Sequence, residues 1–280
     1  MKTVAIVGVG LIGGSFALAL RKAGFSGTIV GVSSPAAIAA AEVRGVIDSG
    51  VTLQEAAATA DLIYLSQPIH GILSTINHLG PLVRQDCLVT DAGSTKSEIV
   101  SNARNLFTLG NFLGGHPMAG KELSGVQHAD ADLFRGRTYV LTPEHPQDLD
   151  TPVTRGFRNW LDRIGANVLV LTPSEHDRVV AFTSHLPQLL STALAATVSE
   201  QIDGDSNHLQ VSGSGLRDST RLALSSFEIW HDILTSNTTE IDHALHLYID
   251  KLQRIRQNLT NLQLREEFTV AAQVARRLRD

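Results

Sequence analysis

The feature that most constrains this chain is a glycine-rich turn near its start, between a β-branched run and a run of small apolar residues. Residues 3–8 read TVAIVG, and residues 8–20 read GVGLIGGSFALAL. Gly8, Gly10 and Gly13 have the spacing of the dinucleotide-binding fingerprint: the first allows a tight turn, the second admits a pyrophosphate, and the third lets helix and strand pack closely. The N-terminus of the following helix then faces the anion. The order strand, turn, helix predicts a nucleotide-binding βαβ unit.

Short β-branched runs alternate with Ala-rich stretches through the first 171 residues. The expected strands are VAIVG, TIVGVS, LIYLS, CLVTDAG, NFLGG, RTYVLT and NVLVLT. This alternation predicts a parallel sheet with crossover helices. Thr172, Pro173 and Glu175 then form a helix-start signature, and the residues beyond are rich in Leu and Ala. We therefore expect an α/β Rossmann-like N-terminal domain over residues 1–171 and an all-α domain over residues 172–280.

A heptad-like seam runs through the second expected domain. Apolar residues repeat there at intervals of four and three: Ile241, Leu245, Tyr248, Leu252, Ile255, Leu259 and Leu262. A helix with such a seam needs an apolar partner. The partner is either another helix of the same chain or a second subunit, and the spacing leaves both open.

Composition excludes several classes of protein. The net charge is −5 with 18% charged residues, and no basic block suggests nucleic-acid or lipid-headgroup binding. No apolar run approaches the roughly 18 residues of a membrane span. The single cysteine, Cys87, cannot form an internal disulfide, and the N-terminus does not resemble a signal peptide. No His/Cys spacing suggests a metal site. We expect a cytoplasmic protein with a small-molecule ligand.

The end of the second expected strand, TIVGVSS, bears on the choice of cofactor. An NAD-specific fold carries Asp or Glu there to bind the ribose 2′-hydroxyl, whereas this chain has Ser33 and Ser34. Two hydroxyls can donate to a 2′-phosphate that a carboxylate would repel, so the sequence predicts NADP. The serines can also cap the helix that starts at Pro35, and the two roles are compatible.

Two polar loops follow consecutive expected strands. DAGSTK spans residues 91–96, and GGHPMAGKELSG spans residues 114–125. Because the carboxyl ends of parallel strands share one edge of a sheet, both loops should meet beside the cofactor crevice. His116 can there accept the proton released when a hydroxyl-bearing carbon gives up hydride. From spacing alone, a histidine that only ties a loop is equally consistent.

Five motifs, in this order, resemble the prephenate and arogenate dehydrogenases of tyrosine biosynthesis: GVGLIGGSFALAL, DAGSTK, GGHPMAGKELSG, SHLPQLL and GLRDSTRLA. The resemblance covers most of the chain. It implies a Rossmann-like domain, a helical domain that forms a homodimer, and oxidative decarboxylation of a cyclohexadienol. The serines at the second strand and the short chain, without a fused mutase or regulatory domain, most resemble NADP-dependent arogenate dehydrogenases, which make L-tyrosine. The alternative is a prephenate dehydrogenase giving 4-hydroxyphenylpyruvate.

The resemblance also implies residue roles. His116 is similar to the family's catalytic histidine, and Ser94 to the serine that orients the ring hydroxyl and the nicotinamide. The candidates for substrate binding are Arg221, Arg217, His185, Lys121, Glu122 and Trp230. The candidates for cofactor binding are Gly8, Gly10, Leu11, Ile12, Gly13, Ser33, Ser34, Ser66, Gln67, Pro68 and Gly93.

Several substrate-binding candidates have alternative interpretations. Arg221 matches the arginine that binds a substrate carboxylate, and Arg217 would share its face on a helix, although Asp218 can pair with either. His185 and Trp230 are typical of core packing as well. Lys121 and its neighbour Glu122 are candidates for substrate discrimination or simply surface charges.

The sequence allows two other functions. A different β-hydroxyacid-type dehydrogenase would carry a catalytic lysine in its helical domain, and no such motif is evident. A non-catalytic NADP-binding redox sensor needs no proton acceptor, so the combination of His116 with Ser94 disfavours it. If His116 is a base that must be neutral, activity should fall below a pKa of about 6 to 7.

Overall fold

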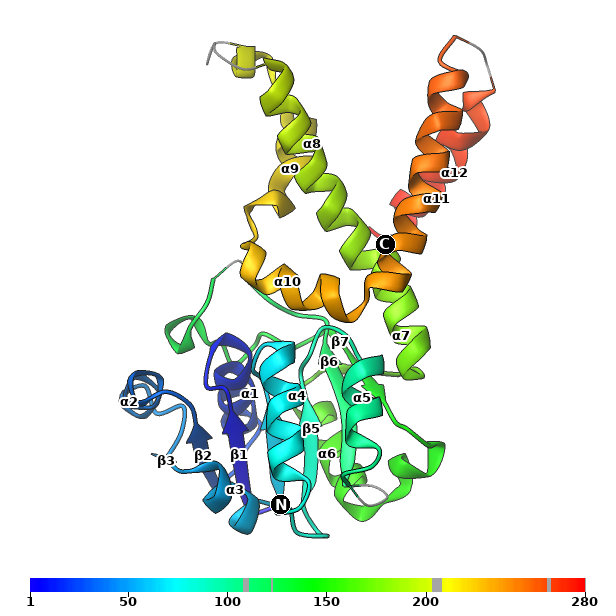
Figure 1. Cartoon of the computed structure of the whole chain (residues 1–280). Helices are drawn as coiled ribbons and strands as arrows, with labels where there is room; N and C mark the ends of the chain where they lie inside the picture. Colours follow the sequence, from blue (N-terminus) through cyan, green and yellow to red (C-terminus); the bar gives the residue numbers. More distant parts are fainter. Residues whose placement is uncertain (108–110, 122, 203–207, 261–262, 280) are drawn as a thin grey trace.

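The computed structural model describes residues 1–107, 111–121, 123–202, 208–260 and 263–279. A sheet with helices on both faces forms the N-terminal part, and two helical arms extend away from it (Figure 1). The fold is therefore an α/β Rossmann-like domain followed by a helical domain, as the sequence predicts.

The sheet has the strand order β3-β2-β1-β4-β5-β6-β7-β8 among the described residues. Its strands are β1 (Thr3–Val7), β2 (Thr28–Val32), β3 (Ser49–Gly50), β4 (Leu62–Leu65), β5 (Leu88–Asp91), β6 (Phe112–Pro117), β7 (Thr138–Thr142) and β8 (Asn167–Val170). The order reverses beside β1, which creates a crevice at the carboxyl ends of β1 and β4.

All of the expected strands are present, but the expectation of a wholly parallel sheet is wrong in one place. Strand β7 pairs antiparallel to β6, with Gly115 opposite Leu141. The described connection between them holds only the 3₁₀ turn η1 (Val126–His128), and a parallel pairing requires a longer crossover element. The two-residue strand β3 was not predicted, because Ser49 and Gly50 lack strand propensity.

The sheet is buried on both faces, which explains its nearly continuous apolar strands. Successive side chains of a strand point to opposite faces, so Val4 and Ile6 join one core cluster while Ala5 and Val7 join the other. The covering helices are α1 (Leu11–Lys22), α2 (Pro35–Val43), α3 (Leu53–Thr59), α4 (Ile69–Leu79), α5 (Ser97–Ala103) and α6 (Pro152–Arg163), with the 3₁₀ segment η2 (Pro146–Asp150).

The glycine turn between β1 and α1 has the geometry that its spacing predicts. Gly8 has φ +90°, a conformation that other residues rarely adopt. A Cβ on Gly13 would lie 2.3 Å from Ser66 Oγ and 2.6 Å from the Gly8 carbonyl oxygen, whereas one on Gly10 would meet nothing within 4 Å. Gly13 therefore allows helix and strand to pack, and Gly10 leaves the backbone open.

The second part of the chain is helical. Its elements are α7 (Pro173–Val180), the π-helical turn η3 (Ala181–His185), α8 (Leu186–Ile202), η4 (His208–Val211), α9 (Ser214–Thr220), η5 (Arg221–Leu224), α10 (Phe227–Ser236), α11 (Thr238–Gln257) and α12 (Leu264–Arg277). The expected helix start is confirmed, because Thr172 and Glu175 form a reciprocal capping box. Helices α8 and α9 form one arm and α11 and α12 the other, while α10 lies across the carboxyl edge of the sheet (Figure 1).

The apolar seam of α11 divides into two halves. Ile241 is buried with Ala181 and Leu186, and Leu245 and Tyr248 pack against the same cluster. Farther along the helix, Leu252 is 47% exposed and Leu259 is 67% exposed. The final seam residue, Leu262, lies outside the described residues. The first half thus packs within the chain, and the second half presents apolar side chains to solvent.

One helical stretch bears on the expectation that no apolar run approaches the length of a membrane span. Pro173–Ile202 is continuous and, by length and composition alone, apolar enough to cross a membrane. The core helix of a globular protein passes the same test. Its first turns bury His176 and Asp177 beside the sheet domain, and Gln188 is buried farther along. These polar contacts favour packing within the protein.

We expect a side chain at Gly13 to damage the fold and one at Gly10 to spare it. Gly13→Ala forces the Ser66 side chain, the Gly8 carbonyl and the Ile6 side chain to move. Overpacking of this kind costs about 1–3 kcal/mol, so the melting temperature should fall by several degrees. Gly10→Ala is the matched control and should leave the melting temperature unchanged while weakening dinucleotide binding. Equal melting temperatures for the two variants would contradict this account.

Candidate active site

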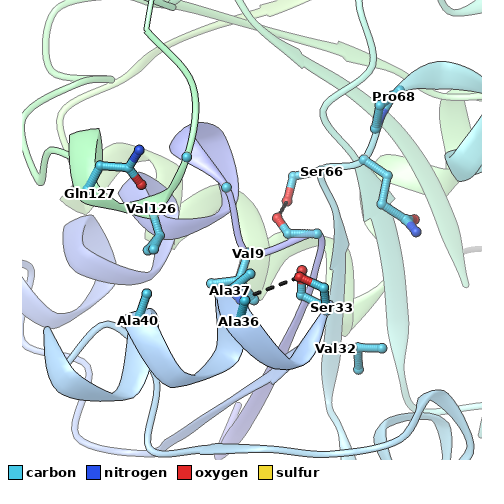
Figure 2. A pocket seen from close by; sticks show the side chains of 15 residues that line it. Val9, Val32, Ser33, Ala36, Ala37, Ala40, Ser66, Pro68, Val126 and Gln127 are labelled. Atoms are coloured by element: carbon cyan, nitrogen blue, oxygen red, sulfur yellow. Dashed lines mark hydrogen bonds between the residues drawn. The ribbon is translucent and has the colours of Figure 1, made fainter.

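A groove of about 760 Å³ opens at the carboxyl edge of the sheet, where β1, β2 and β4 end (Figure 2). It is lined by Gly8, Val9, Gly10, Val32, Ser33, Ser34, Ala36, Ala37, Ala40, Ser66, Gln67, Pro68, Gly125, Val126 and Gln127. Many of the expected cofactor-binding residues are among them. Leu11, Ile12, Gly13 and Gly93 do not line the groove, and three of these, Leu11, Gly13 and Gly93, are buried.

The groove has a mostly apolar floor and an uncharged lining. The small side chains of α2 and the segment 125–127 were missed from the sequence, because nothing local marks residues that only form a wall. Ser33 and Ser34 are exposed at its edge, and the Ala37 amide donates to Ser34 Oγ at 3.4 Å (Figure 2). Of the described residues that line the groove, none carries a charged side chain. Ser34 therefore caps α2, and no carboxylate stands where a 2′-phosphate would lie.

The turn at the mouth of the groove is held by side chains of the β4–α4 loop. Ser66 Oγ donates to the Gly8 carbonyl oxygen at 2.9 Å, and Gln67 Oε1 accepts from Thr75 Oγ1 at 2.9 Å. Both residues are expected cofactor-binding positions. Their hydrogen bonds fix the backbone that borders the crevice.

His116 stands near the end of β6, half-buried, and is part of a chain of hydrogen bonds. His116 Nδ1 lies 2.8 Å from His176 Nε2, and His176 Nδ1 lies 2.8 Å from Asp177 Oδ1. His176 and Asp177 are both buried on α7. These two residues were not predicted from the sequence, because the polar run SEHDR at the start of the helix does not single them out.

The surroundings of His116 favour the neutral imidazole. Burial is the main cause that lowers the pKa of His116 well below its usual value of 6.5. The positive charge that can be carried by His176, Lys96 and His185 lowers it further. This direction places the expected acid limb below the pKa of 6 to 7 that the sequence suggested. Burial likewise lowers the pKa of His185 to about 4. Both histidines are neutral at pH 7.

Asp177 joins α7 to the loop that carries Ser94. Its Oδ1 accepts from the Lys96 amide at 2.7 Å, and its Oδ2 accepts from the Ser97 amide at 2.8 Å. Burial alone raises the pKa of Asp177, but hydrogen bonds from His176, Ser97 and Lys96 outweigh burial and bring the pKa below its usual value. The carboxylate is ionised and holds the start of α5 against the helical domain.

A buried ion pair connects the loop of Ser94 to the strand of His116. Lys96 Nζ contacts the Asp91 carboxylate and donates to the Gly115 carbonyl oxygen at 2.8 Å. Asp91 Oδ1 accepts from the Gly115 amide at 3.1 Å, and Asp91 Oδ2 accepts from the Gly93 amide at 2.8 Å. Desolvation lowers the pKa of Lys96, and contact with Asp91 opposes that shift.

This ion pair fixes the relative position of the two polar loops. Ser94 is half-buried between the buried residues Gly93 and Thr95, directly after β5. Because β5 and β6 are paired neighbours, Ser94 and His116 lie at adjacent strand ends. The structure thus brings the two expected catalytic residues to one edge of the sheet.

His185 and Trp230 contact each other in the helical part of the chain. Their rings meet edge to face with centroids 5.9 Å apart, and His185 Nδ1 lies 3.3 Å from Asn237 Nδ2. Asn237 Nδ2 also donates to the Asp177 carbonyl oxygen at 2.9 Å. His185 is thus a buried, hydrogen-bonded histidine linked through Asn237 to Asp177. Trp230 packs against the second core cluster.

The other expected substrate-binding residues are farther out. Arg217 is exposed in the last turn of α9, and Arg221 opens η5, so a change of helix type separates them and the expected single helical face is interrupted. Lys121 Nζ pairs with Asp130 Oδ2 at 2.9 Å on the surface. Glu122 lies outside the described residues.

Comparison with known proteins agrees with both domains. The chain matches the nucleotide-binding domain of prephenate dehydrogenase over residues 16–170 and the prephenate dehydrogenase dimerization domain over residues 172–272. It is 35% identical to the prephenate dehydrogenase of Lactococcus lactis over 95% of this chain and 71% of that protein.

Solved structures show the same relationship. The prephenate dehydrogenase from Aquifex aeolicus in complex with hydroxyphenyl propionate and NAD⁺ has a TM-score of 0.88 and 30% identity, covering 100% of this chain and 99% of that one. The arogenate dehydrogenase of Synechocystis has a TM-score of 0.81 and 32% identity, covering 98% and 97%. The chain therefore belongs to the prephenate dehydrogenase family, whose nucleotide-binding and helical domains correspond to the two parts described above.

Proposed function

We propose that this protein converts L-arogenate to L-tyrosine by oxidative decarboxylation, with NADP⁺ as the hydride acceptor. Prephenate, which would give 4-hydroxyphenylpyruvate, is the second candidate substrate. Relatives named for each substrate support the two candidates about equally. The observation that carries the proposed reaction is the half-buried His116, which lies with Ser94 at adjacent strand ends on the edge where the nucleotide groove opens. Its lowered pKa favours the neutral imidazole that a base requires.

The residues of the groove fit a nicotinamide dinucleotide. The open backbone at Gly10 and the N-terminus of α1 would hold the pyrophosphate, and Ser33 and Ser34 would face the adenosine ribose. When bound, the nicotinamide supplies an acceptor for the hydride of the carbinol carbon. The protein's own task is to orient the ring hydroxyl and to hold its proton.

His116 performs that task as a base that is regenerated in each cycle. Its neutral imidazole takes the hydroxyl proton as the carbinol carbon is oxidised, while Ser94 orients the hydroxyl. The bond to the ring carboxylate then breaks, carbon dioxide leaves, and the bond pair enters the ring, which becomes aromatic. His116 returns the proton to the ring oxygen to give the phenol. No net proton is released.

The two candidate substrates differ in one group, which is an ammonium in arogenate and a keto oxygen in prephenate. An ammonium requires an acceptor or a carboxylate, whereas a keto acid favours a donor. Asp218 is exposed on α9 between Arg217 and Arg221, so an arginine can bind the side-chain carboxylate while Asp218 accepts from the ammonium. Asp218 is thus our candidate acceptor, and contact of Asp218 with the substrate would favour arogenate.

The helical arms support a homodimer. The arms, together with η4, η5 and α10, expose large apolar side chains: Leu194, Leu209, Val211, Leu224, Phe227, Ile229, Leu252, Leu259, Phe268, Val270, Val274 and Leu278. An isolated soluble chain rarely exposes this many, and the arms diverge away from the sheet domain (Figure 1). A second copy that covers these faces agrees with the match to a dimerization domain.

The first test is turnover of each substrate by the wild type and by His116→Asn. We expect reduced-nicotinamide absorbance to rise faster with arogenate than with prephenate. Asn keeps a hydrogen bond but lacks the basic nitrogen, so kcat should fall by about 10²-fold to 10⁴-fold with little change in cofactor affinity. Because the pKa of His116 is lowered, kcat/KM of the wild type should stay level from pH 8 to about 6.5 and decline only below that.

Arg221→Gln is the contrasting variant. Loss of a charge-assisted contact weakens binding of the ground state and of the transition state together, so KM should rise much more than kcat falls.

If the wild type turns over prephenate faster than arogenate, prephenate is the substrate. Near-normal kcat in His116→Asn would move the base elsewhere and make His185 the next candidate.

Ser33→Asp should shift the cofactor preference towards NAD. The new carboxylate repels a 2′-phosphate and accepts from a free 2′-hydroxyl. The measurement is kcat/KM with NADP⁺ and NAD⁺ for the wild type and the variant. Ala36→Ser, on the same rim of the groove, adds no charge and serves as the control. A wild type that uses the two cofactors equally would contradict the NADP proposal.

Leu252→Asp should weaken the homodimer, because it places a charge on the exposed half of the seam. Light scattering of the wild type at micromolar concentration should give twice the 30.1 kDa of one chain. Gln253→Asp adds the same charge at the neighbouring exposed position and should leave the mass unchanged. A wild-type mass near that of one chain would rule out the dimer.

A further inference from the structure

Hydrogen bonds connect three side chains from two domains in a row, beginning at His116. His116 comes from β6 of the sheet domain, and His176 and Asp177 come from α7 of the helical domain. The distances are 2.8 Å from His116 Nδ1 to His176 Nε2 and 2.8 Å from His176 Nδ1 to Asp177 Oδ1. His176 and Asp177 are buried, while His116 is half-buried.

The order of the groups determines where each proton lies. An ionised carboxylate only accepts hydrogen bonds, so His176 must carry its proton on Nδ1 to donate to Asp177. Neutral His176 then has a lone pair on Nε2, which can accept from His116 Nδ1–H. Neutral His116 is therefore protonated on Nδ1 and has its lone pair on Nε2. One carboxylate thus selects the tautomer of a histidine two hydrogen bonds away.

We propose that His176 and Asp177 form a proton relay with His116, in which they set His116 as the base with a free Nε2 and share the proton that it takes up. The inference rests on the proposed function, because it concerns the same base. When the hydroxyl proton reaches His116 Nε2, the Nδ1 proton can pass to His176 Nε2. The cation is then held on His176 beside the Asp177 carboxylate. Both transfers reverse when the ring oxygen is protonated, so the relay ends unchanged.

The charges around His116 explain why a relay is useful there. Lys96 faces it from the β5–α5 loop and His185 from η3, and each opposes a positive charge on His116. The charge of Lys96 is countered by Asp91, which contacts it directly. On the other side of His176 stands Asp177, whose carboxylate favours a cation on that imidazole. A positive charge on His176 is in direct contact with the Asp177 carboxylate, whereas the hydrogen bond from the His116 ring is to His176.

Asp177→Asn is the sharpest test, because it changes the direction of the hydrogen bonds with little change in size. With its NH₂ group at the Oδ1 position, the amide donates to His176 Nδ1 and its oxygen still accepts from the Ser97 amide, while the Lys96 amide loses its acceptor. In that orientation His176 carries its proton on Nε2, and His116 carries its own on Nε2, where it cannot act as a base.

Two readouts separate this effect from a structural one. In ¹⁵N NMR of the imidazole-labelled full-length protein with NADP⁺, wild-type His116 should show a protonated Nδ1 and an unprotonated Nε2, and Asp177→Asn should exchange them. An enforced wrong tautomer should lower kcat by up to about 10⁴-fold with KM nearly constant, the size of the equivalent change in the serine-protease triad. Glu175→Gln is the control, since it makes the same carboxylate-to-amide change on α7 outside the relay and should leave both readouts unaltered.

A second pair of variants covers the case in which Asp177→Asn does not fold. His176→Gln retains an acceptor for His116 Nδ1–H but cannot take up a proton, whereas His176→Leu offers no acceptor. We expect a loss of kcat in both, greater in His176→Leu, and a mixture of His116 tautomers in His176→Leu alone. The relay is wrong if the His116 tautomer stays the same in His176→Leu and Asp177→Asn. If the tautomers change as expected but neither arogenate nor prephenate is turned over by the wild type, the proposed function fails instead.

Discussion

The carboxylate of Asp177 is the group on which the arrangement of the site depends. It accepts hydrogen bonds from two backbone amides at the start of α5 and from the imidazole of His176. One side chain therefore connects the sheet domain to the first helix of the helical domain. A buried carboxylate is tolerated only when hydrogen bonds replace its water. Because each of those donors comes from a segment that shapes the site, the requirement to satisfy Asp177 also fixes the position of the loop that carries Ser94.

A buried ion pair likewise fixes backbone positions within the sheet domain. Asp91 and Lys96 are fully buried, and together they hold the backbone of Gly93 and Gly115. Replacing a buried ion pair with apolar groups is often neutral for stability, so its energy alone does not explain it. Its directional bonds tie the end of β5 to β6. We attribute to it the precise placement of Ser94 relative to His116.

The helical arms follow a different physical rule. The junction between them is closed by a small core around Ile241 and Ala181, but farther out the apolar side chains of α11 and α12 face solvent. Burial of apolar area is the main favourable term in association, and it scales with the area removed from water. The base of the helical domain is thus organised by its own chain, while its outer parts leave apolar area that the proposed second copy would cover.

The sequence by itself determined the features that depend on near neighbours. The turn at Gly8, the capping box at Thr172 and the strands of the sheet follow from glycine conformation, end-group hydrogen bonding and side-chain periodicity, and His116 was found because a motif surrounds it. Only the tertiary structure decided the antiparallel pairing of β7, the groove wall, and the contact of His116 with His176 across 60 positions of the chain. A long-range contact depends on how whole elements pack, and the residues on either side of it carry no local pattern that encodes it.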